Sequence, residues 1–275
     1  MSTRFCRFFY FTLIYCGLFC GVSIVFTSAD EPPQKMEQTI VVQEEQKQEQ
    51  QNSADKSKEQ KEPKEKTEKH PLLQLEKVTV IIEGEVLQQE GIHEWAGKAG
   101  KLVTEWYPKM EALLQSDGYI PPKEVTLIFR KMDGVAYTTG NIIYISANWI
   151  RRQPNDFGMV AHELVHIIQS YPRRTGPGWI TEGIADYIRH AHYEPNVKLP
   201  RINPDHASYR DAYKTTAGFF IWIEKNYNKE FVKKLNVAMR ECTYKDDIFQ
   251  DLTGKPLDDL WKEYADTFRS NSLFY

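Results

Sequence analysis

The sequence predicts an α+β fold, with a small mixed sheet in the N-terminal half and helices in the C-terminal half. Three runs rich in β-branched residues, at 78–82, 125–129 and 141–146, come first, and apolar residues at helical spacing follow Pro154. Strands followed by a run of helices are typical of this class. With 275 residues, 41% of them hydrophobic, the chain can form one catalytic-sized domain.

The first 29 residues have the pattern of an export signal. Arg4 and Arg7 precede an apolar stretch at 8–26, and small residues lie near Ala29. The stretch is long enough to stay in a membrane, so cleavage and an uncleaved anchor both remain open. We expect a secreted, periplasmic or cell-surface protein, tethered to the membrane through residues 8–26 if the signal is retained.

Residues 30–71 are dominated by Gln, Glu, Lys, Ser and Pro, with one small apolar island at 40–42. Such a segment buries too little apolar surface to offset its chain entropy, which predicts a disordered charged tether before a folded domain at 72–275. The net charge of -3 provides no field that would attract nucleic acid, which is therefore not an expected partner. Beyond residue 29 the one cysteine is Cys242, which excludes a disulfide within the domain.

Within the domain, turn and cap residues divide the chain into elements. Prolines close the first helix, a turn region with two glycines separates the second and third strands, and Asn155 or Asp156 caps the first helix of the C-terminal half. The expected elements are strands at 78–82, 125–129 and 141–146, and helices at 92–114, 155–170, 179–192, 205–226, 229–240, 244–252 and 256–270.

The pentapeptide HELVH at 162–166 is the first candidate for chemistry. His162 and His166 are four residues apart on a predicted helix, so their imidazoles project from one face and can reach a single ion. Glu163 lies beside the first histidine, in position to act as general base on a zinc-bound water. The motif predicts a zinc site, although two partly buried histidines on an amphipathic helix would have the same spacing.

Glu182 and Asp186 are candidates for a third metal ligand and for a hydrogen-bond partner of a histidine ligand, which the pentapeptide does not provide. Catalytic zinc usually takes three protein ligands, and Glu182 follows the histidines on the next predicted helix, after a Gly-Pro-Gly turn at 176–178. Asp186 lies one turn further on, where it can accept a hydrogen bond from a zinc-bound histidine. The bland alternative is that both carboxylates complement a helix dipole. Together with the pentapeptide they favour a His, His, Glu metal site.

These segments carry a resemblance to a known family. HELVH together with GWITEGIADYIR at 178–189 resembles the plant basic secretory protein family, zinc peptidases that are also found in bacteria. The similarity extends from about 78 to 268, through 134–138, 213–217 and 257–264. It implies a zincin fold with a glutamate as third ligand, as in gluzincins, in an exported hydrolase. This chain is mildly acidic and has a long tether, so the plant proteins' substrates are not carried over.

Two further roles are expected of a peptidase. Tyr213 is the candidate for stabilising the oxyanion, because the resemblance places a tyrosine there, with core packing as the alternative. By analogy with zincins, the strand at 141–146 is predicted to be the edge strand that holds extended substrate.

The sequence thus favours an exported zinc metallopeptidase that acts on protein or peptide substrates, with Zn²⁺ held by His162, His166 and Glu182. Two alternatives stay open. One is a surface-tethered binding protein without catalysis on a zincin fold. The other is a zinc hydrolase of a non-peptide amide or ester, because an activated water attacks either carbonyl.

Overall fold

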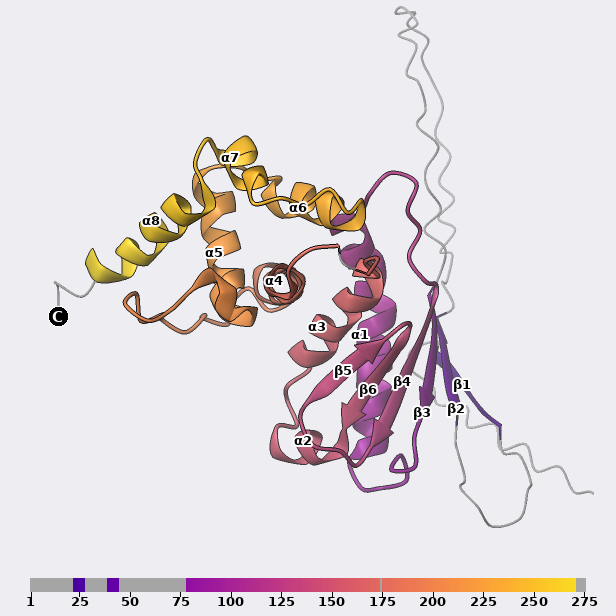
Figure 1. Ribbon diagram of the computed structural model, residues 1–275. Helices are drawn as coiled ribbons and strands as arrows, with labels where there is room; N and C mark the ends of the chain where they lie inside the picture. The colour runs from indigo at the N-terminus through magenta and orange to yellow at the C-terminus, as the bar shows by residue number, and fades with distance from the viewer. Residues whose placement is uncertain (1–21, 28–38, 45–77, 174, 271–275) are drawn as a thin grey trace, which may run out of the picture.

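The computed structural model describes residues 22–27, 39–44, 78–173 and 175–270 (Figure 1). Its strands are β1 (Val22–Thr27), β2 (Thr39–Glu44), β3 (Thr79–Glu83), β4 (Glu124–Arg130), β5 (Ala136–Thr139) and β6 (Ile142–Ser146). Its α-helices are α1 (Ile92–Leu113), α2 (Ala147–Arg152), α3 (Gly158–Gln169), α4 (Gly178–Ile188), α5 (Tyr213–Asn226), α6 (Phe231–Arg240), α7 (Asp247–Thr253) and α8 (Leu257–Ser270). A sheet followed by a helical half confirms the predicted α+β class.

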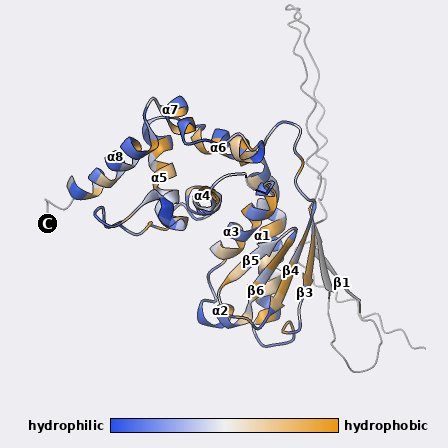
Figure 2. Ribbon diagram, viewed as in Figure 1, coloured by the Kyte–Doolittle hydropathy of each residue, from blue (hydrophilic) through white to orange (hydrophobic). Residues whose placement is uncertain are grey.

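The strands form one mixed sheet in the order β1-β2-β3-β4-β6-β5. β4 pairs in parallel with β3 and with β6, whereas the other pairs are antiparallel. Alternate residues of the central strands are fully buried, among them Leu127 and Ile143. α1 lies along one face of the sheet, and Figure 2 shows hydrophobic residues along β3, β4 and β6. The sheet and α1 therefore form the base on which α3 is held.

β5 corrects the predicted sheet. The sequence predicts a turn region before 141, but residues Ala136–Thr139 form a strand that pairs with β6 and takes the edge position. β6 is therefore internal, and the prediction that 141–146 is the edge strand is wrong. Gly140 has φ 60°, which permits a tight hairpin turn. β5 has only four residues, two of them threonine, so its sequence does not show the alternation of polar and apolar residues by which a strand is predicted.

β1 and β2 lie where the sequence predicts no strand. β1 falls within the predicted export signal or anchor, and β2 within the predicted tether, around its apolar island. Both segments are rich in β-branched residues, which favour pleated backbone. Most of residues 1–71 lie outside the described part of the chain, so the division at 29 and 71 stays a prediction. Among the described residues, no helix has the length and apolar character needed to cross a membrane.

The helical half differs from prediction at several places. The helix predicted at 155–170 begins only at Gly158, with Phe157 at its N-cap in place of Asn155 or Asp156. The helix predicted at 179–192 is α4 followed by a π-helical turn at Arg189–Tyr193. The helix predicted at 205–226 begins only at Tyr213, after a short 3₁₀ turn at Tyr209–Asp211. Ser208 and Asp211 form a capping box around that turn, and Ala212 then adopts φ 61° and ψ -167°, which interrupts helical backbone.

Close packing of α4 on α5 fixes the position of α4. A Cβ atom on Gly183 would lie 2.2 Å from the methyl carbon of Thr216, so glycine is required where the two helices meet. Thr216 is itself fully buried and donates a hydrogen bond of 2.7 Å to the carbonyl of Tyr209. The α4 residue just before Gly183 is Glu182, whose placement therefore depends on this contact.

Ala212 occupies a backbone conformation that is almost restricted to glycine. We expect Ala212→Gly to raise the free energy of unfolding by about 1 kcal/mol, because the strain of the native conformation is relieved. Urea unfolding of metal-free protein measures the effect. Ala217→Gly in the interior of α5 is the matched control and should lower the free energy of unfolding by roughly 0.5–1 kcal/mol. Equal losses for both variants would show that Ala212 is unstrained.

Candidate metal centre

α3 places the two histidines of HELVH on one side of the helix. The Nε2 atoms of His162 and His166 lie 3.1 Å apart, and the ring planes are nearly perpendicular, at 85°. His162 is buried with 8% of its surface exposed, because α3 packs between the sheet and α4. Two imidazole nitrogens thus converge on one point, as the four-residue spacing predicts.

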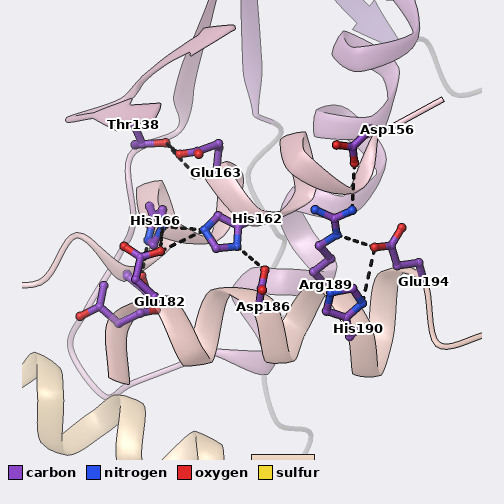
Figure 3. Close-up of polar contacts among 12 residues, drawn as sticks. Thr138, Asp156, His162, Glu163, His166, Glu182, Asp186, Arg189, His190 and Glu194 are labelled. Carbon is purple, nitrogen blue, oxygen red and sulfur yellow. Dashed lines mark hydrogen bonds and ion pairs between the residues drawn. The ribbon is translucent and has the colours of Figure 1, made fainter. Parts of the chain in front are cut away.

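α4 brings Glu182 to the same point. Its Oε2 atom lies 3.2 Å from Nε2 of His162 and 3.4 Å from Nε2 of His166 (Figure 3). The three ligands of a tetrahedral zinc ion, each about 2.0–2.2 Å from the metal, lie roughly 3.3–3.6 Å apart. The two histidines and Glu182 match that triangle in donor type and in spacing. These three residues, called the metal group below, could therefore hold a metal ion.

Each histidine is held by a partner on its other nitrogen. Nδ1 of His162 lies 2.6 Å from Oδ1 of Asp186, the contact expected from the sequence. Nδ1 of His166 lies 2.8 Å from Oε1 of Gln169, whose amide nitrogen donates to the carbonyl of Thr181 at 3.0 Å. These contacts leave both Nε2 atoms free to face the metal position. Gln169 is not predicted from the sequence, where its spacing of three residues from His166 on the helix is the one available signal.

When no metal is bound, the carboxylates of Asp186 and Glu182 favour the protonated form of His162. Burial lowers the pKa of His162, but hydrogen bonds to Asp186 and Glu182 outweigh it and raise that pKa to about 9. Burial raises the pKa of Glu182, yet its contacts with both histidines bring it down to about 2. The cluster therefore prefers a positive charge between its carboxylates, which is the preference that a metal cation meets.

Glu163 lies beside the metal group and contacts the edge strand. Its carboxylate Oε2 accepts a hydrogen bond of 2.7 Å from the hydroxyl of Thr138 on β5 (Figure 3). Glu163 is 8% exposed, so the carboxylate is largely withdrawn from water. The sequence predicts Glu163 but not Thr138, since no local pattern relates residues on a strand and a helix that are this far apart.

A cleft of about 790 Å³ opens over these residues. One wall is β5 and the other is the start of α5, where the ring of Tyr213 stacks on that of His162 with centroids 6.0 Å apart. Tyr213 is 54% exposed, which speaks against core packing. The negative charge of Glu182 raises the pKa of Tyr213, so the phenol keeps its proton and can donate a hydrogen bond.

Arg189, just after the end of α4, contacts two acidic residues. Its guanidinium contacts Asp156 at 2.9 Å and forms a short hydrogen bond with Glu194 (Figure 3). His190 is 4% exposed, and within the described residues neither of its ring nitrogens has a hydrogen-bond partner. Its Nδ1 lies 3.5 Å from Oε1 of Glu194, too far for a good hydrogen bond.

His190 should make the stability of the protein sensitive to mild acid. Burial lowers the pKa of His190 below its ordinary 6.5, although Asp186 and Glu194 oppose this. The neutral ring is thus favoured in the folded state, and its contribution to stability is complete above pH 6.5 and lost as the pH falls toward the lowered pKa. Relative to His190→Gln, metal-free wild type should lose unfolding free energy between about pH 7 and pH 5. If urea unfolding shows that the free energies of unfolding of the two proteins change equally across that pH range, this prediction is wrong.

The residues described above lie in a segment of the chain that matches a known protein family. The family model BSP, described as "Peptidase of plants and bacteria", matches residues 94–264, which include β4 to α7 and the whole metal group. No curated protein matches this chain. Among solved structures, an M1 zinc metallopeptidase from Deinococcus radiodurans is similar, with a TM-score of 0.40 and 9% sequence identity. The alignment covers 70% of this chain and 48% of that one, so this chain spans about half its length.

Proposed function

Because the chain belongs to the BSP family, peptidases of plants and bacteria, we propose that it is an exported, zinc-dependent peptidase with a gluzincin-type site. The observation that carries this is the triangle of His162, His166 and Glu182, at 3.1–3.4 Å, with Glu163 next to it in an open cleft. Export is supported by the signal-like pattern at 1–29.

In this proposal, each residue of the site has a separate role in hydrolysis. His162, His166 and Glu182 would hold the ion, and Asp186 and Gln169 would keep the two imidazoles turned toward it. When bound, zinc supplies a Lewis acid that polarises the scissile carbonyl and lowers the pKa of water. Glu163 is placed to take the proton of the attacking water and to pass it to the leaving amine. Tyr213, protonated and at the cleft wall, is placed to donate a hydrogen bond to the oxyanion.

β5 is the wall that fits an extended peptide. Ser146 donates a backbone hydrogen bond of 3.0 Å to the carbonyl of Val135, and residues alternate between bonded and unbonded pairs along an antiparallel ladder. The backbone groups of Ala136 and Thr138 are then directed to the outer edge of β5. No other strand of the described residues pairs with that edge. A substrate chain can add there as a further strand.

Metal analysis combined with a cleavage assay tests the proposal. Purified protein should contain one zinc per chain and cleave casein, an unstructured protein that exposes many peptide bonds. Treatment with a chelator should remove both the zinc and the activity, and stoichiometric zinc should restore both. A protein that binds zinc tightly but cleaves neither casein nor a peptide library would overturn the peptidase proposal in favour of a non-catalytic binding role.

A further inference from the structure

We propose that Thr138 is the positioning residue for Glu163, so that a single strand both holds the substrate and aims the general base. The hydroxyl of Thr138 lies 2.7 Å from Oε2 of Glu163 and 3.0 Å from the backbone carbonyl oxygen of the same residue. In the described part of the chain, this hydroxyl is the one hydrogen-bond partner of the Glu163 carboxylate.

The hydroxyl has one proton, and the carboxylate is its better acceptor. The carbonyl of Glu163 lies within α3, where it can accept the regular helical hydrogen bond, whereas the carboxylate has no such partner. The contact with the carboxylate is also the shorter of the two, at 2.7 Å against 3.0 Å for the carbonyl. Thr138 therefore occupies Oε2 and leaves Oε1 as the oxygen available for the proton of the attacking water.

The same residue is part of the wall that we assign to substrate. The backbone N–H and C=O groups of Thr138 point to the open edge of β5, as the hydrogen-bond alternation with β6 requires. Its side chain points instead to α3. A peptide that extends the sheet at β5 would thus be held by the backbone of the same residue whose hydroxyl orients Glu163. This geometry separates the two roles, because a change of side chain leaves the backbone contacts in place.

Thr138→Val tests the role, since valine has nearly the shape of threonine without the hydroxyl. With a peptide taken from a casein cleavage site as substrate, kcat should fall roughly 10- to 100-fold, as for other partners that orient a catalytic group. KM should stay within about 3-fold, because the backbone of β5 is unchanged. Thr138→Ser, which restores the hydroxyl, should recover most of kcat, and zinc content should be equal in all three proteins.

Thr139→Val is the matched control. Thr139 is the next residue of β5, is exposed, and makes no contact with Glu163 among the described interactions, so this variant should behave as wild type. If the valine variant at 138 does not fold, Thr138→Ala carries the same expectation. A wild-type kcat in the variants that lack the hydroxyl, a loss confined to KM, or a loss of zinc would each overturn the proposal.

This inference rests on the proposed function, and the two fail in different ways. If Glu163→Gln cleaves the peptide as fast as wild type, the proposed mechanism itself is wrong. If Glu163→Gln is inactive while Thr138→Val is fully active, only the role of Thr138 is wrong.

Discussion

Glu163→Gln is expected to lower kcat for peptide cleavage by about 10²- to 10⁴-fold while the protein keeps its zinc. Glutamine has the shape of glutamate and can still accept a hydrogen bond from Thr138, but its amide cannot take a proton from water. The metal group does not include Glu163, so its three donors are unchanged. Single-turnover cleavage of a casein-derived peptide, with zinc measured on the same sample, gives both quantities.

Two controls make the result specific to proton transfer. Glu241→Gln makes the same change of glutamate to glutamine at an exposed residue outside the cleft and the metal group, and it should retain activity. Glu163→Asp keeps the carboxylate but shortens it, so its activity should lie between those of Glu163→Gln and wild type. Equal rates for Glu163→Gln and wild type would sink the proposed mechanism.

The metal group was predictable because helical periodicity fixes its geometry locally. Four-residue spacing on α3 is sufficient to bring His162 and His166 together, and the same spacing on α4 relates Glu182 to Asp186. The turn between the helices is short, which limits how they can be arranged. Thus the sequence predicts the three residues that converge and a contact of Asp186 with one of the two histidines, and the structure shows that this histidine is His162, at 2.6 Å.

The cleft walls were not predictable in the same way. β5 has four residues, two of them threonine, and its place at the edge depends on hydrogen bonds to β6 rather than on its own composition. The contact of Thr138 with Glu163 requires the register of β5 against α3, a tertiary relation that no local pattern encodes. The start of α5 depends on the strained, non-helical backbone of Ala212. Alanine has the highest helix propensity, so the sequence predicts that the helix continues through this residue.

Replacement of Glu182, the proposed third ligand, should abolish activity through loss of the metal rather than loss of the general base. Glu182→Gln is expected to lose zinc, with a decrease in affinity larger than the roughly 10- to 100-fold that the loss of an outer partner usually causes. The carboxylate is ionised at neutral pH, because its contacts with both histidines bring its pKa to about 2 despite burial. A neutral amide offers the cation neither that charge nor an equally good oxygen donor.

Asp186→Asn provides the graded comparison, since Asp186 touches His162 but lies outside the metal group. Its zinc affinity, measured by competition with a chelator, should fall roughly 10- to 100-fold, less than that of Glu182→Gln. Excess zinc should restore much of the activity of Asp186→Asn and little of that of Glu182→Gln. If instead Glu182→Gln binds zinc as tightly as wild type, Glu182 is not a ligand. The convergence of its Oε2 on the two Nε2 atoms would then reflect only the attraction between a carboxylate and a protonated histidine.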